Sequence, residues 1–291
     1  MQDIFILKPT NTRYSISENF PHPSQGKNVG VFLSGGLEST LILKIAIDVY
    51  GKDRVIAFYS DEIFTYKNPN GNRNVWTNVS NSAKNLGVEP KYLAIDYDLH
   101  MTDKMASAKK LIEEGAKNFN VEFTMWGFTK LFFNVGEFKT DENSTHESII
   151  AQCYSDLEKY KDVIEEFHLP TGEFSQYVKD LDIPGDVYNM LDYDYNHGYK
   201  IKSPFRTLNK GEVVDLYRQL GCVDLAYSTR SCVTDSISEN GKHCGTCFNC
   251  QQRYDAFAVL GLRDKTEYES DNIVKAWTKL QEALKNDSKK N

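Results

Sequence analysis

Residues 28–50 read NVGVFLSGGLESTLILKIAIDVY, and this stretch decides the fold. Val29–Leu33 is a short apolar run with the length and β-branched content of a buried strand. The run breaks at Ser34-Gly35-Gly36, and apolar residues then recur at helical spacing. The stretch therefore predicts a strand, a glycine loop and a helix in direct succession.

The predicted loop has the chemistry of an anion-binding site. Gly35 and Gly36 permit positive φ and close approach of a ligand. The first N–H groups of the next helix lack intrahelical partners and carry the positive end of its dipole. Ser34, Ser39 and Thr40 add hydroxyl donors, so we expect phosphate to bind here. The loop matches neither the Walker A motif nor the G-x-G-x-x-G dinucleotide fingerprint.

Strands and helices alternate beyond this unit. The same patterns predict further elements at residues 54–59, 75–86, 92–95, 103–118 and 122–126. Short links between such elements favour an α/β fold with an open, mostly parallel, doubly wound sheet. Ligands of such sheets lie at the carboxyl ends of the strands. This rule places Ser60 and Asp61, which follow the second strand, on the same rim as the glycine loop.

The pattern divides the chain into five regions. We expect a loosely structured lead-in with an edge strand at residues 4–7, a nucleotide-binding α/β core, a mostly helical insertion, a closing strand and helix with a cysteine-rich region, and a C-terminal helix. Their bounds are residues 1–27, 28–127, 128–199, 200–265 and 266–291. Within the closing region, Asn209 is predicted to cap a helix at residues 211–220.

Composition narrows the class of protein. The 291 residues carry a net charge of −7, so there is no basic surplus of the kind that general nucleic-acid binders use. No apolar run reaches the length of a transmembrane helix, and the first residues lack the pattern of a secretory signal. We therefore expect a cytoplasmic protein.

Four of the six cysteines lie close together. Cys232 is followed, after eleven residues, by Cys244-Gly-Thr-Cys247-Phe-Asn-Cys250. Four thiolates at this spacing favour a closed tetrahedral zinc site. An iron–sulfur cluster is the alternative, although the ferredoxin pattern places its fourth cysteine downstream, before a proline. We expect Cys250 to open a helix that runs to Leu260.

The glycine loop resembles the S-G-G-x-D-S signature of the PP-loop ATP pyrophosphatases, with Glu38 at the Asp position. Enzymes of that family cleave ATP between the α and β phosphates and transfer AMP to a substrate. SPFRTLNKGEV, at residues 203–213, resembles a later element of the family, in which a lysine at the start of a helix reaches the phosphates. The resemblance implies this role for Lys210 and an acidic role for Glu38.

The tail SCVTDSISENGKHCGTCFNCQQRYDAF narrows the resemblance to the 7-cyano-7-deazaguanine synthase family. Matching positions are Cys232, Gly241, Cys244, Gly245, Cys247, Cys250, Arg253, Ala256 and Phe257. That family activates the carboxylate of 7-carboxy-7-deazaguanine as an acyl adenylate. Ammonia then displaces AMP to give an amide, and a second ATP converts the amide to the nitrile.

The resemblance implies ATP, Mg²⁺ and Zn²⁺ as cofactors. The resemblance also implies that Lys210 and Glu38 are catalytic and that the four clustered cysteines, Cys232, Cys244, Cys247 and Cys250, bind the zinc ion. ATP would contact Ser34, Gly35, Gly36, Leu37, Glu38, Ser39, Thr40, Ser60 and Asp61. We expect a small nucleobase and ammonia as partners, with no membrane and no strong nucleic-acid signature, and we keep a homodimer open.

Two strings differ from those of the family and leave the acceptor open. Residues 59–64 replace a Tyr-Gly-Gln-Arg-His-like string, and residues 128–138 replace the substrate loop. The alternatives are adenylation of another acceptor, such as a tRNA or a protein end, an RNA-modifying PP-loop enzyme of the thiolation or lysidine type, and a non-catalytic nucleotide-binding homologue.

Overall fold

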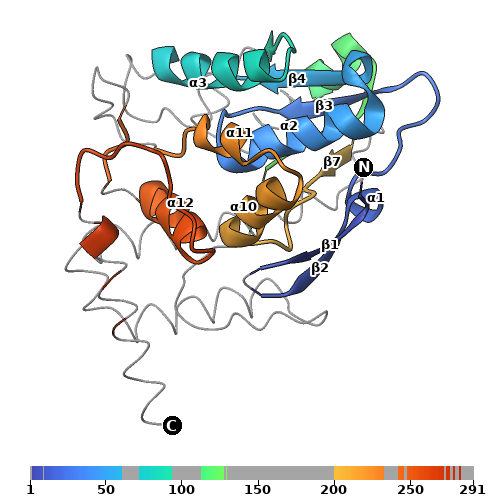
Figure 1. Cartoon of the computed structure of the whole chain (residues 1–291). Helices are drawn as coiled ribbons and strands as arrows, with labels where there is room; N and C mark the ends of the chain where they lie inside the picture. Colours follow the sequence, from blue (N-terminus) through green and yellow to red (C-terminus); the bar gives the residue numbers. More distant parts are fainter. Residues whose placement is uncertain are drawn as a thin grey trace, which may run out of the picture.

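This computed structural model describes residues 2–8, 10–60, 72–93, 113–127, 129, 200–232, 242–245, 248–271, 273–275, 278 and 282. Five parallel strands form its main sheet in the order β5-β4-β3-β6-β7 (Figure 1). The strands are β3 (Asn28–Phe32), β4 (Val55–Tyr59), β5 (Lys91–Tyr92), β6 (Val121–Met125) and β7 (Lys200–Lys202). The stretch that decides the fold thus supplies the central strand, and the predicted parallel α/β sheet is confirmed.

Helices cover both faces of this sheet. The main described helices are α2 (Leu37–Tyr50), α3 (Asn72–Asn85), α10 (Lys210–Gln219), α11 (Val223–Tyr227) and α12 (Phe248–Ala258), with a short η1 (Lys52–Arg54). On one face, α2 packs on β3 and β4 and also contacts α10 and α11 (Figure 1). Phe58 points to the other face, where its ring lies 5.6 Å from Phe119 of a helical segment at 113–119.

Tight packing at β3 explains its glycine. A Cβ on Gly30 would lie 2.6 Å from Thr124 Oγ1 on β6 and 2.7 Å from the Phe58 ring on β4. Such separations are far below van der Waals contact, so only a residue without a side chain fits there. The side chains of Thr124 and Phe58, one from each neighbouring strand, therefore cover the central strand at this point.

The start of α10 is fixed by a capping box. The Asn209 side chain accepts from the Glu212 N–H at 2.9 Å, and the Glu212 carboxylate accepts from the Asn209 N–H at 2.8 Å. The predicted cap at Asn209 is confirmed. Burial raises the pKa of Tyr217 well above its usual value. The protonated hydroxyl donates to the Leu37 carbonyl at 2.8 Å, which joins α10 to the first turn of α2.

The expectation of a loosely structured lead-in is wrong. The predicted strand exists as β1 (Ile4–Leu7), but it pairs with β2 (Thr12–Ser15) in an antiparallel hairpin instead of joining the main sheet. The hairpin is ordered because Phe5, Leu7 and Tyr14 are buried in the main core. The Tyr14 hydroxyl also donates to the Pro204 carbonyl.

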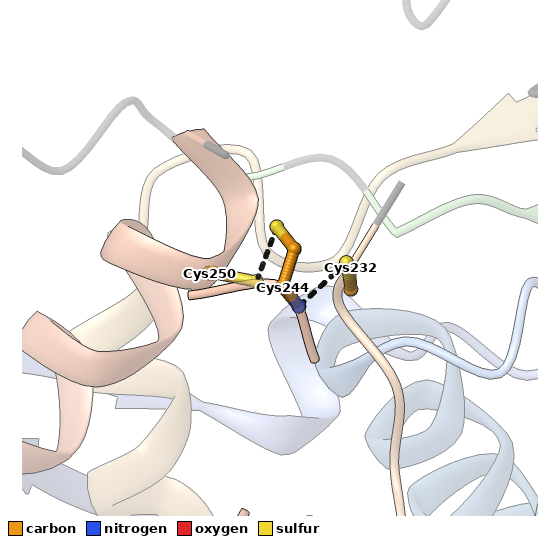
Figure 2. A group of neighbouring side chains, drawn as sticks. All are labelled: Cys232, Cys244 and Cys250. Carbon is orange, nitrogen blue, oxygen red and sulfur yellow. Dashed lines mark hydrogen bonds between the residues drawn. The ribbon is translucent and has the colours of Figure 1, made fainter. Parts of the chain in front are cut away.

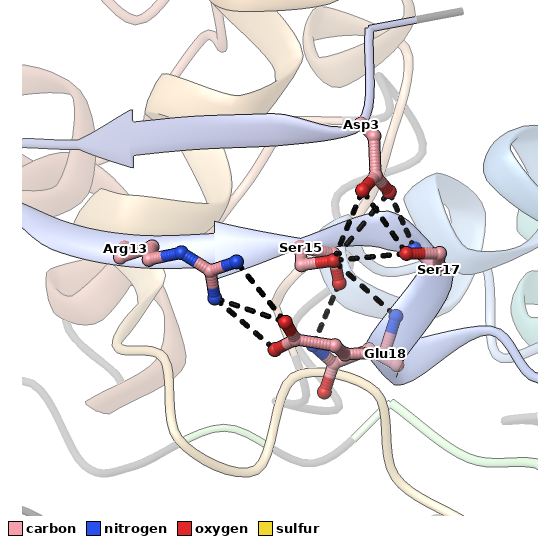
Figure 3. A network of polar contacts seen from close by, with 6 residues as sticks. Asp3, Arg13, Ser15, Ser17 and Glu18 are labelled. Atoms are coloured by element: carbon pink, nitrogen blue, oxygen red, sulfur yellow. Dashed lines mark hydrogen bonds and ion pairs between the residues drawn. The ribbon is translucent and has the colours of Figure 1, made fainter.

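Polar contacts close this hairpin onto the short α1 (Ile16–Asn19) (Figure 3). Asp3 accepts from the Ser17 N–H at 2.7 Å and from the hydroxyls of Ser15 and Ser17. These hydrogen bonds, led by the Ser17 N–H, hold the pKa of Asp3 below its usual value. Arg13 and Glu18 pair at 3.0 Å across the same turn. The N-terminus is thus tied to its own first helix.

Other expected elements have mixed outcomes. The helical insertion at 128–199 lies outside the described residues, apart from Thr129, and so does most of the helix at 103–118. The C-terminal helix begins later than expected, because residues 266–271 are not helical. Backbone bonds between His243 and residues 267 and 269 hold this segment extended. No described helix has the length and apolar content needed to cross a membrane.

Arg253 on α12 is the centre of a buried polar network. Its guanidinium pairs with Asp264 at 2.9 Å, and neither side chain is more than 1% exposed. It also donates to the Thr229 hydroxyl at 2.8 Å and to the Ala226 carbonyl at 3.0 Å. Burial opposes ionisation of Asp264, but Arg253 and hydrogen bonds from Tyr268, Arg253 and Thr266 outweigh it and lower the pKa of Asp264.

Replacing Asp264 by Asn should destabilise the fold strongly. The substitution leaves the Arg253 charge buried without a counter-ion, which costs about 3–5 kcal/mol. Because the pKa of Asp264 is lower in the folded state, its contribution is present above the unfolded pKa of about 3.9 and is lost as the pH falls through the folded value. Urea unfolding of both proteins at pH 7 and at decreasing pH measures this difference.

Asp224→Asn is the matched control for that experiment. Asp224 pairs with Lys265 at 3.2 Å, but the two side chains are 89% and 63% exposed. Exposed pairs contribute little, so the control should unfold like the wild type. Equal unfolding of the two variants would contradict the assignment of Arg253 and Asp264 as a buried, interdependent pair.

Candidate functional site

The glycine loop ends in a helix start that has no side-chain cap. Gly36 is the N-cap of α2, with φ −79° and ψ 174°, and within the described residues there is no side-chain cap hydrogen bond at this helix start. The hydroxyls of Ser34 and Ser39 lie 3.0 Å apart, and Ser39 also accepts from the Ser34 N–H at 3.1 Å. Uncapped N–H groups, a helix dipole and two hydroxyls together suit an anion such as phosphate.

Gly35 fixes the shape of this loop. Its φ of +77° is a conformation that side chains disfavour, and a Cβ would lie 2.7 Å from the Asn78 backbone on α3. The Gly35 carbonyl accepts from the Arg230 N–H at 2.9 Å. The loop is therefore held between α3 on one side and the segment after α11 on the other.

Glu38 and Lys210, the two residues predicted for catalysis, lie together. Lys210 Nζ is 3.3 Å from Glu38 Oε1, and the side chains are 12% and 13% exposed. Thr129 Oγ1 donates to the same Glu38 oxygen at 3.3 Å. The first residue of α10 thus places a cation beside the positive end of α2, with one carboxylate between them.

Gly127 makes this arrangement compact. A Cβ on Gly127 would lie 2.9 Å from both Ser39 N and Glu38 Cβ, so the end of β6 runs directly against the first turn of α2. The sequence showed only that a glycine follows a strand, which signals a strand end and not a contact. Gly127, Thr129 and Arg230 were not predicted as part of the site.

The other residues predicted to contact ATP, Ser60, Thr40 and Asp61, lie in different surroundings. Ser60 follows β4 at the same sheet edge, 4% exposed, and its hydroxyl has no hydrogen-bond partner among the described residues. Thr40 instead directs its hydroxyl to Ser82 of α3 at 3.1 Å, and its N–H bonds to the Gly36 carbonyl. Asp61 lies outside the described residues. The ligand roles of all three stay predictions.

Three of the four predicted metal ligands gather in one buried cluster (Figure 2). The sulfur atoms of Cys232, Cys244 and Cys250 all lie within 4.8 Å of one another, and those of Cys244 and Cys250 are 3.8 Å apart. Four sulfurs at about 2.3 Å from one tetrahedral ion would be about 3.8 Å apart. Cys247 lies outside the described residues.

The surroundings of the cluster suit a metal. The predicted helix exists as α12, but it begins at Phe248, before Cys250, and ends at Ala258. Cys250 lies in its first turn, where the helix dipole favours a thiolate. Gly245 has φ +72°, and its Cβ position is 2.4 Å from the Ser270 carbonyl, so the turn between the cysteines requires glycine. Burial, together with the charges of Arg253 and Arg230, lowers the pKa of His243 to about 3 and keeps it neutral.

A family model described as queuosine biosynthesis protein QueC matches residues 28–261, which include both the glycine loop and the cysteine cluster. The chain belongs to the QueC family. The resemblance to the 7-cyano-7-deazaguanine synthase family is thereby confirmed.

Curated relatives named 7-cyano-7-deazaguanine synthase match over a shorter length. The protein from Ectopseudomonas mendocina is 37% identical over 71 residues, which is 24% of this chain and 30% of the relative. The protein from Methanobrevibacter smithii is 36% identical over 81 residues, which is 28% of this chain and 33% of the relative. The chain thus spans about a third of the length of these curated relatives.

Among solved structures, the U34-tRNA thiolase NcsA from Methanococcus maripaludis with its 4Fe-4S cluster aligns at 13% identity and a TM-score of 0.44. The alignment covers 97% of this chain and 85% of that chain. This similarity is too low to support a conclusion about the fold or the function of this chain.

The two loop glycines should respond differently to substitution by alanine. Gly35→Ala places a methyl group against the Asn78 backbone at positive φ, so we expect a loss of about 1–3 kcal/mol of stability. Gly36→Ala keeps an allowed φ, and the new Cβ would lie 3.4 Å from Ser34 Oγ and 3.5 Å from the Arg230 carbonyl, which are ordinary contacts.

Gly36→Ala should therefore keep the melting temperature of the wild type but fill the space above the helix N-terminus. We expect its ATP dissociation constant to rise about tenfold or more, equivalent to about 1.4 kcal/mol. Thermal unfolding and isothermal titration calorimetry with ATP measure the two effects. Normal ATP affinity in folded Gly36→Ala would show that the anion does not bind over α2.

Proposed function

We propose that this QueC-family protein is an AMP-forming, ATP-dependent ligase that converts 7-carboxy-7-deazaguanine and ammonia to the nitrile through an acyl adenylate. The observation that carries the proposal is the Glu38–Lys210 ion pair, at 3.3 Å, beside the uncapped start of α2. A transfer of AMP needs little covalent chemistry from the protein, because positioning and charge stabilisation lower the barrier. The site offers both.

The residues of the loop divide the work. Backbone N–H groups at the start of α2 and the hydroxyls of Ser34 and Ser39 bind the β and γ phosphates. Lys210, freed from Glu38 when the phosphates enter, stabilises the charge that builds on the departing pyrophosphate. Glu38 would then be free to hold Mg²⁺ through its carboxylate oxygens, and this hard cation, which prefers oxygen ligands, would offset phosphate charge.

The adenosine end of ATP has a place on the neighbouring strand. Ser60 lies at the carboxyl end of β4, beside the loop in the sheet, with a buried hydroxyl that has no hydrogen-bond partner in the described part of the chain. A buried polar atom without a partner is costly, so a ligand that bonds to it gains affinity. We therefore assign Ser60 to the nucleoside of ATP. The ATP contact of Asp61 stays a prediction, and so does the cytoplasmic location of the protein.

Zinc is the metal that the cysteine cluster suits best. Cys232, Cys244, Cys247 and Cys250 would hold it, and the bound ion would fix the chain where these cysteines meet. In a 4Fe-4S cluster each cysteine binds a different iron atom, which keeps the sulfurs farther apart than around a single ion. The 3.8 Å separation of Cys244 and Cys250 favours the single ion.

The metal assignment predicts the metal content of two cysteine variants. Cys232→Ser should lose most of the zinc of the purified protein, because it removes one of the clustered sulfurs. Cys222→Ser should keep about one zinc per chain, since Cys222 lies outside the cluster and burial raises the pKa of its thiol. Mass spectrometry of the metals measures both. Iron with acid-labile sulfide in the wild type would contradict the zinc assignment.

The reaction itself is tested by incubating the protein with ATP, Mg²⁺, ammonium and 7-carboxy-7-deazaguanine. Lys210→Ala should lower kcat/KM about 10²–10³-fold, the usual cost of losing a charge stabiliser at the reacting group. Lys44→Ala is the control. Lys44 also forms an ion pair, with Asp48 one turn later in α2, but this pair lies on the partly exposed face of the helix. Mass spectrometry follows AMP and the nucleobase.

The products separate the proposed reaction from its alternatives. Amide or nitrile that depends on Lys210 supports the synthase. AMP without a modified base keeps the ATP chemistry and directs the search to a tRNA or a protein end as acceptor. No AMP from folded, metal-loaded protein contradicts an enzyme acting on this substrate and favours a nucleotide-binding homologue.

A further inference from the structure

The segment Thr229–Cys232 contacts both the glycine loop and the cysteine cluster. The Arg230 N–H donates to the Gly35 carbonyl at 2.9 Å, and the Arg230 carbonyl lies 3.5 Å from the Cβ position of Gly36. Two residues later, Cys232 contributes its sulfur to the cluster and accepts from the Cys244 N–H at 3.5 Å. One short piece of backbone therefore borders both proposed sites.

The first end of this segment is anchored by Arg253. The Thr229 hydroxyl accepts from Arg253 at 2.8 Å and donates to the Ala226 carbonyl at 2.7 Å, and Thr229 is 4% exposed. Arg253 belongs to α12, the helix that also carries Cys250. The element that supplies a metal ligand thus also positions the start of the segment.

The middle of the segment is also tied to the cysteine cluster, because the Arg230 guanidinium donates to the Lys242 carbonyl at 3.4 Å, two residues before Cys244. Ser231, between Arg230 and Cys232, has a buried hydroxyl without a hydrogen-bond partner among the described residues. The position of Arg230 is therefore set by its neighbours Thr229 and Cys232 and by the chain that leads into Cys244. Thr229 is fixed by the Arg253 guanidinium, and Cys232 belongs to the cysteine cluster.

We propose that metal binding at the cysteine cluster and ATP binding at the glycine loop are thermodynamically coupled through Thr229–Cys232, with Arg230 as a positioning residue. The inference rests on the proposed nucleotide and metal sites. Without the ion, Cys232 is no longer held to Cys244 and Cys250, and the Arg230 N–H loses its fixed position opposite Gly35. ATP must then order the loop as it binds, which lowers its affinity.

Coupling of this kind is reciprocal, so it is measured from both sites. The probes are Mg²⁺ with α,β-methylene-ATP, which resists cleavage, and zinc. We expect the zinc-depleted protein to bind the analogue about 5–150-fold more weakly than the zinc-loaded protein. In a competition with a chromogenic zinc chelator, the analogue should raise the zinc affinity of the full chain by the same factor. Equal affinities in each pair of measurements would overturn the proposal.

Two threonine variants separate this segment from the general stability of the C-terminal region. Thr229→Val and Thr266→Val each remove a hydroxyl that accepts from Arg253, at 2.8 Å and 2.9 Å, but only Thr229 belongs to the segment. When the affinities of the zinc-loaded and zinc-depleted forms of each variant are compared, Thr229→Val should reduce the coupling factor and Thr266→Val should keep it. An equal reduction in both variants would overturn the route through Thr229–Cys232.

The readouts do not involve turnover, so the coupling and the proposed reaction can fail separately. Holoprotein that binds the analogue with no coupling to zinc overturns this inference and leaves the ligase activity standing. Coupling in a protein that makes no nitrile supports the inference and overturns the proposed substrate. Holoprotein that does not bind the analogue overturns both.

Discussion

Close packing against glycines in β3, in the loop that follows it and after β6 is the constraint on which the rest of the structure depends. Three glycines allow it: Gly30 leaves room for side chains of the two neighbouring strands, Gly35 lets α3 approach the loop, and Gly127 lets the chain after β6 approach the first turn of α2. Each Cβ position lies less than 3 Å from an atom of the neighbouring element. The N–H groups at the start of α2 are therefore presented by backbone alone, which moves less than side chains do.

A positive charge is placed beside the start of α2 by a residue far along the chain, Lys210. Lys210 begins a helix whose start is fixed by the Asn209–Glu212 box, and Tyr217 joins the same helix to Leu37. The ion pair with Glu38 is therefore set by the position of α10 and not by flexible side chains. In a low-dielectric setting, a cation held in this way stabilises developing negative charge more than a solvated one does.

The sequence predicts this fold well where local signals suffice. Strand, glycine loop and helix at residues 28–50, the cap at Asn209 and the cysteine spacing each carry their signal within a few residues. The N-terminal hairpin was missed because its order comes from burial of Phe5, Leu7 and Tyr14 against distant elements. Gly127, Thr129 and Arg230 were missed for the same reason, since contacts across the fold leave no periodic pattern in the chain.

The hydrogen bond between Tyr217 and Leu37 joins residues that are 180 positions apart. The pairings of Glu38 with Lys210 and of Gly35 with Arg230 span similar distances along the chain. Contacts of such high sequence separation form late and slow folding. During synthesis the glycine loop is therefore made early, but the residues that contact it belong to the last third of the chain and are made much later. The nascent N-terminal half therefore contains the glycine loop without the residues that pack against it in the folded protein.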